Sequence, residues 1–132
     1  MNRSHTTEIR VRYAETDAMG VLHHAGYLIY FEIGRTEALR EDGGSYADVE
    51  KAGRFLVVVE ANVKYRSPAR YDDLLTLVTT VSRVTPAKLE HEYELRRGEK
   101  LIATGHTVLA CVDAEGKVHR VSDALPALAE LM

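Results

Sequence analysis

The chain has 132 residues, 45% of them hydrophobic, which is enough for one packed core, so we expect a single domain over residues 1–132. Its formal net charge is −3 and it has no run of five basic residues, which disfavours nucleic acid as a partner. No segment approaches the roughly 20 apolar residues of a membrane span, and the start lacks the apolar run of a signal peptide. We therefore expect a soluble, cytoplasmic protein whose single cysteine, Cys111, is buried and inert.

The first third of the chain predicts one strand followed by one long helix. Residues 6–13 alternate between apolar and polar side chains, which is the pattern of a half-buried strand. A loop with two glycines and two histidines follows. Residues 25–41 contain no proline and are apolar around most of the helical circumference, which predicts a buried helix. Ser45 is the expected N-cap of a short second helix.

The remainder predicts long strands joined by short turns. Strand patterns cover residues 55–66, 74–84, 88–96 and 101–112, and a short strand and a terminal helix are expected after residue 117. In the first of these strands, the alternation places Val57 and Val59 on the same face as Tyr65. The fold class is therefore α+β, with one buried helix followed by a meander of antiparallel strands. Because one helix covers only one side of such a sheet, we expect self-association.

Asp17 is the first candidate for chemistry. It lies in the glycine-bearing loop seven positions before His24, where the long helix begins. A helix N-terminus offers unpaired N–H groups and a partial positive charge, which suit a developing oxyanion. A carboxylate near it can attack a carbonyl or activate water. A loop aspartate is also a common cap or turn residue, and the spacing alone leaves both readings open.

The sequence DAMGVLHHAGY, residues 17–27, resembles hotdog-fold acyl-CoA thioesterases of the 4-hydroxybenzoyl-CoA thioesterase and YbgC type, and the similarity extends from Ile9 to about Val112. The resemblance implies one long central helix wrapped by a five-to-six-stranded antiparallel sheet. In it, Asp17 matches the catalytic carboxylate, acting as nucleophile or general base. His24 matches the position whose backbone N–H polarises the thioester carbonyl, with a side chain that assists in the YbgC type.

The resemblance also implies the substrate, the partners and a set of binding residues. Acyl-CoA would be cleaved to free acid and coenzyme A with no further cofactor, in homodimers or homotetramers whose active sites lie at subunit interfaces. Family members bind coenzyme A phosphates with a basic turn between two long strands, where this chain has Arg83 and Lys88, with Arg66 and Arg70 as alternatives. The expected substrate-binding residues are Gly20, Val21, Tyr27, Glu60, Asn62, Arg83 and Lys88. Glu60 and Asn62 alternatively form a solvated or interface face.

Three further readings follow from the same residues. His23, His24 and Asp17 lack a further strong ligand, so we expect no metal site. A hotdog-fold hydratase acting on acyl-CoA or acyl-carrier protein is one rival, but the acid–histidine dyad of that class is absent. A non-catalytic acyl-CoA-binding protein is the other, and Asp17 argues against it. The acyl group, the thiol carrier and the choice between dimer and tetramer are left open by the sequence.

Overall fold

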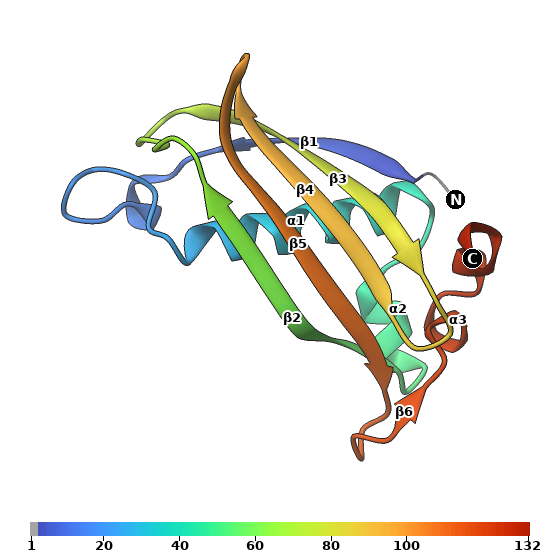
Figure 1. The fold of residues 1–132 in the computed structure, drawn as a ribbon. Coiled ribbons are helices and arrows are strands. Elements are labelled where there is room, and N and C mark those ends of the chain that lie inside the picture. Colours follow the sequence, from blue (N-terminus) through green and yellow to red (C-terminus); the bar gives the residue numbers. More distant parts are fainter. Residues whose placement is uncertain (1–2) are drawn as a thin grey trace.

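A computed structural model describes residues 3–132, in which six strands form one antiparallel sheet that curves around a long helix (Figure 1). The strand order is β1-β3-β4-β5-β2, and β6 pairs with β5. The strands are β1 (Ser4–Arg10), β2 (Phe55–Tyr65), β3 (Leu74–Val84), β4 (Leu89–Arg97), β5 (Lys100–Val112) and β6 (Val118–His119). The helices are α1 (Gly26–Glu41), α2 (Tyr46–Lys51) and α3 (Val121–Ala124), with 3₁₀ turns at η1 (Tyr13–Glu15) and η2 (Pro126–Leu131). This confirms the expected α+β arrangement.

Helix α1 packs on the concave face of the sheet through large aromatic side chains. Tyr30 and Phe31 are fully buried, and the Phe31 ring stacks on Tyr93 of β4 with 4.3 Å between ring centroids. The opposite side of α1 carries Leu28 and Ile29, which are 40% and 56% exposed. The helix predicted to be buried all round is thus covered on one side only in a single chain. No helix within residues 3–132 is long and apolar enough to cross a membrane.

Strand β2 departs from the alternation predicted for it. Its register against β5 shifts between Val58 and Glu60, which marks a β-bulge. A bulge adds one residue to one strand and reverses which face the following side chains occupy. Leu56 before the bulge and Val63 after it pack against the core, whereas Val57 and Val59 are exposed, so the single alternation predicted for residues 55–66 does not run through the strand.

One end of the sheet is closed by short elements. The predicted cap is confirmed, because the Ser45 hydroxyl accepts a hydrogen bond from the Asp48 N–H at 3.1 Å. At the same end, α3 and η2 bury Val121 and Leu128 against the core. Cys111 is a buried free thiol there, and burial raises its pKa, which suppresses the reactive thiolate as expected.

Polar side chains are buried between α1 and the sheet. Arg35 donates to the Tyr93 hydroxyl at 3.3 Å, and this hydroxyl lies 2.7 Å from the Thr107 hydroxyl. Arg35 thus links α1 to the sheet. His91 and Thr79 are 4% and 2% exposed, and neither His91 Nδ1 nor the Thr79 hydroxyl has a hydrogen-bond partner. These two orphan groups are costly to bury.

Replacing Gly34 by alanine is expected to destabilise the protein by about 1–2 kcal/mol. Alanine in a helix interior normally stabilises by about 1 kcal/mol relative to glycine, so a loss of stability here would be opposite to the usual effect of this substitution. A Cβ at Gly34 would overlap the Thr79 hydroxyl and lie 2.6 Å from Leu77 Cδ2, which forces α1 away from β3. Urea unfolding measures the change. Addition of Thr79→Ala to the Gly34→Ala variant should recover part of the loss, and a stabilised single variant would contradict the close contact.

Candidate active site

Asp17 lies at the first position of a tight turn. Its N–H donates to the Val21 carbonyl at 2.9 Å, and the Gly20 N–H donates to the Asp17 carbonyl at 3.0 Å. The side-chain oxygen Oδ1 accepts from the Met19 N–H at 2.9 Å and from the Val21 N–H at 3.4 Å. Gly20 has φ +76°, a left-handed conformation that glycine adopts without strain. The turn reading of Asp17 is therefore correct as far as one oxygen is concerned.

The same turn occurs a second time in the chain, at Asp113. Its Oδ1 accepts from the Glu115 and Lys117 N–H groups, both at 3.0 Å, and Gly116 has φ +82°. The second oxygen of Asp113 is bound to His119 Nε2 at 2.8 Å, and this hydrogen bond is the main cause that lowers the pKa of Asp113 to about 2. By contrast, Oδ2 of Asp17 has no hydrogen-bond partner among residues 3–132. This free oxygen separates Asp17 from an ordinary turn aspartate.

The entry to α1 presents an unpaired backbone donor. The His23 N–H donates to the Glu15 carbonyl at 2.9 Å, and the Gly26 N–H donates to the His23 carbonyl at 2.8 Å. The Ala25 N–H donates to His23 Nδ1 at 3.1 Å. Within the described chain the His24 N–H has no acceptor, and His24 lies two residues before Gly26, the first residue of the helix. An N–H in this place is a ready donor for an anion.

Asp17 and His24 line the same surface depression, which has a volume of about 370 Å³. Val21 from the turn and Tyr65 from the end of β2 complete much of its wall, and Tyr27 of α1 lies beneath. Burial raises the pKa of Tyr27, and the negative charge of Asp17 adds to that increase. The edge of the Tyr27 ring meets the Tyr65 ring with centroids 4.9 Å apart and planes at 89°. The depression is thus an aromatic-walled cavity with a carboxylate at its edge.

Glu15 fastens the Asp17 loop to the core. One of its oxygens accepts from the buried Tyr30 hydroxyl at 2.8 Å and from the Arg12 N–H at 2.8 Å. Burial by itself raises the pKa of Glu15, but the hydrogen bonds from Arg12 and Tyr30 and the charge of Arg12 outweigh it and lower the pKa overall. Glu15 therefore stays ionised at neutral pH and bonds the loop to the core.

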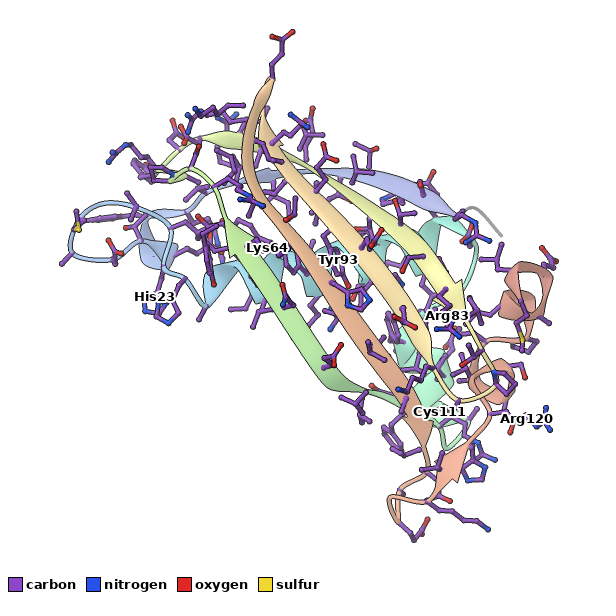
Figure 2. All side chains as sticks on the ribbon, in the orientation of Figure 1. His23, Lys64, Arg83, Tyr93, Cys111 and Arg120 are labelled. Carbon is purple, nitrogen blue, oxygen red and sulfur yellow. The ribbon has the colours of Figure 1, made fainter. Side chains whose placement is uncertain are left out.

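The structure brings together only part of the predicted site. Val21 and Tyr27 lie with Asp17 and His24 around the depression, and Gly20 lies in the adjoining turn. Glu60 and Asn62 line a different groove of about 770 Å³ on strands β2 to β5. Arg83 and Lys88 flank the β3–β4 turn at the end of the sheet opposite His23 (Figure 2). In one chain, these four residues are not neighbours of Asp17.

Sequence reasoning did not assign Tyr65 to the site. Its place at the end of an alternating strand indicated only that it shares a face with Val57 and Val59, yet its side chain is 51% exposed and its hydroxyl donates to the His24 carbonyl at 2.9 Å. Arg66, expected only as an alternative phosphate ligand, lines the depression directly. Within the described residues, no group of three His, Cys, Asp or Glu side chains is arranged to hold a metal ion.

A curved antiparallel sheet around one long helix is the hotdog fold, and a free carboxylate oxygen near an unpaired helix-end N–H suits hydrolysis of an activated acyl group. The family model described as the thioesterase-like superfamily matches residues 11–131. The chain belongs to this superfamily and is a thioesterase.

The relatives agree with this assignment. The acyl-CoA thioesterase YbgC of Haemophilus influenzae is 36% identical over 115 residues, which cover 86% of this chain and 84% of the relative. The acyl-CoA thioester hydrolase YbgC of Escherichia coli O157:H7 is 33% identical over 106 residues, covering 80% and 79%. The solved structure of the DHNA-CoA thioesterase from Staphylococcus aureus has a TM-score of 0.91 and 34% identity, covering 96% of this chain and 87% of the other.

Proposed function

We propose that this protein hydrolyses acyl-CoA thioesters to a free acid and coenzyme A, with Asp17 as the catalytic carboxylate. The observation that carries the proposal is that Asp17 and His24 line one depression, where one oxygen of Asp17 and the N–H of His24 both lack a hydrogen-bond partner within the described chain. The relatives described as acyl-CoA thioesterases support the choice of coenzyme A as the thiol carrier.

Two routes use the same geometry. In the first, Asp17 takes a proton from water, the water oxygen bonds to the thioester carbon, and the resulting oxyanion accepts a hydrogen bond from the His24 N–H. The carbon–sulfur bond then breaks and the thiolate takes up a proton. In the second, Asp17 attacks the carbon itself, thiolate leaves, and water hydrolyses the mixed anhydride. Both routes require the negative charge of Asp17.

We also propose that two copies join through β2 as a homodimer. In the described chain β2 has a neighbour on one side only, and Val58 and Val59 on it are exposed, as are Leu28 and Ile29 of α1. Antiparallel pairing of two β2 edges would set the β3–β4 turn of one copy toward the Asp17 end of the other. That arrangement would give the turn's two basic residues access to a coenzyme A phosphate. Pairing of dimers into a homotetramer is a further step.

The dimer is tested by a charge on the β2 edge. The Val59→Lys variant is expected to shift the protein toward monomer by at least tenfold in dissociation constant, because an edge lysine opposes strand pairing. Light scattering after size exclusion measures the mass. The matched control is Val118→Lys on β6, an exposed valine away from β2, which should leave the mass unchanged. A Val59→Lys protein with undiminished dimer mass would contradict pairing through β2.

A panel of short, medium, long and aromatic acyl-CoAs tests the activity. We expect free thiol to be released from at least one of them by the wild-type protein. A hydratase would instead add water to an enoyl-CoA without thiol release, and a binding protein would retain acyl-CoA intact. Repeating the assay with acyl-carrier protein thioesters shows which of the two thiol carriers the enzyme accepts.

Replacing Arg66, which lines the depression, by glutamine is expected to raise KM for the coenzyme A ester while leaving kcat within about twofold of the wild type.

A further inference from the structure

We infer that His23 and Tyr65 are positioning residues that hold the peptide between His24 and Ala25 from both of its ends and thereby orient the donor at the entry of α1; this inference rests on the proposed thioester hydrolysis. The Tyr65 hydroxyl donates to the His24 carbonyl at 2.9 Å. On the opposite edge of the same peptide, the Ala25 N–H donates to His23 Nδ1 at 3.1 Å.

The geometry of a trans peptide gives these two contacts their effect. The carbonyl and the N–H of one peptide unit point in opposite directions, so bonds at both ends prevent rotation of its plane. The preceding peptide is held as well, because the His23 carbonyl accepts from the Gly26 N–H at 2.8 Å. The His24 N–H belongs to that preceding peptide and therefore points away from the helix. Two bonded peptides in succession leave this donor in a single orientation.

The side chains of the clamp are themselves supported. The Tyr65 ring packs in a T-shaped contact with the buried Tyr27 ring, which restricts where its hydroxyl can lie. The His23 ring stacks on the His24 ring with 4.2 Å between centroids and 30° between planes. Because Nδ1 of His23 accepts a hydrogen bond, a neutral His23 carries its proton on Nε2. One histidine thus caps the helix entry and also restricts the ring of its neighbour.

Alignment of a donor with a developing oxyanion is a transition-state effect, so loss of the clamp should lower kcat more than it raises KM. Three variants separate its parts. Tyr65→Phe removes only the hydroxyl, and His23→Phe keeps a stacked ring but removes the acceptor. His23→Asn removes the ring but restores an oxygen that accepts from the N–H two residues on.

We expect Tyr65→Phe and His23→Phe to lower kcat about tenfold with KM within about twofold, because small misplacements of a catalytic group are costly. The His23→Asn variant should recover kcat to within about threefold of the wild type. Tyr71→Phe is the matched control, since Tyr71 is 58% exposed and its hydroxyl has no hydrogen-bond partner among residues 3–132, and it should leave both constants unchanged. Unchanged kcat in both Phe variants, or a His23→Asn protein as slow as His23→Phe, would overturn the clamp.

A second readout does not depend on activity. In nuclear magnetic resonance of the intact protein, the Ala25 amide should exchange its hydrogen at least tenfold faster in His23→Phe and in Tyr65→Phe than in the wild type, because its peptide is released. Equal exchange in all three would overturn the inference. Should the wild type release no thiol from any acyl-CoA, the proposed function fails, while the exchange rates still decide whether the peptide is clamped.

Discussion

Asp17→Asn is expected to lower kcat for acyl-CoA hydrolysis by about 10²-fold or more while leaving the fold intact. Asparagine keeps an oxygen that can accept from the Met19 N–H, so the turn survives the substitution. It lacks the negative charge that either attacks the thioester or takes a proton from water. Thiol release at saturating substrate measures kcat, and thermal unfolding shows whether the structure is retained.

The second copy of the turn supplies an internal control. Asp113→Asn changes the same atom in the same backbone setting, but the oxygen affected there is bound to His119. We expect Asp113→Asn to lower Tm and to leave kcat unchanged, whereas Asp17→Asn does the opposite. Loss of activity in both variants, or in neither, would mean that Asp17 acts only through its turn.

His91→Leu is expected to remove a large part of the acid sensitivity of the fold. Burial, with smaller contributions from the charges of Arg35 and His106, lowers the pKa of His91 from 6.5 to about 3. Between these values the unfolded chain takes up a proton at this residue that the folded chain does not bind, so stability falls as the pH falls. At pH 5 this group alone costs the folded state about 2 kcal/mol.

Unfolding in urea at pH 7, 6 and 5 checks this prediction. At pH 7 the leucine variant should lie within about 1 kcal/mol of the wild type, since the sizes match and an unsatisfied Nδ1 is removed. The difference between the two proteins should then widen in favour of leucine by about 2 kcal/mol at pH 5. His106→Gln, on a half-exposed histidine that bonds Glu90, is the control and should keep most of the acid sensitivity. Parallel curves for wild type and His91→Leu would show that His91 is protonated in the folded state.

The proposed clamp shows why part of the site could not be predicted. His23 and Asp17 are close in sequence and their loop was recognised, because a glycine-bearing turn before a helix is a local pattern. Tyr65 lies 41 positions after the carbonyl that it binds, and nothing in its own strand indicates a partner on α1. Such a contact depends on where the end of β2 meets the start of α1, which only the packed sheet decides.

The number and type of the main elements could be predicted from residue patterns alone, because burial in a helix or strand imposes a period that the chain displays directly. The sequence also located Asp17 and the start of α1, which are adjacent in the chain. The tertiary structure decided which predicted residues meet. The bulge after Val58 interrupts the alternation of β2, since one inserted residue reverses the faces of the side chains that follow it. The tertiary structure also decided that one oxygen of Asp17 accepts hydrogen bonds within a turn and that the other is free, because hydrogen-bond partners are set by folded geometry and not by residue type.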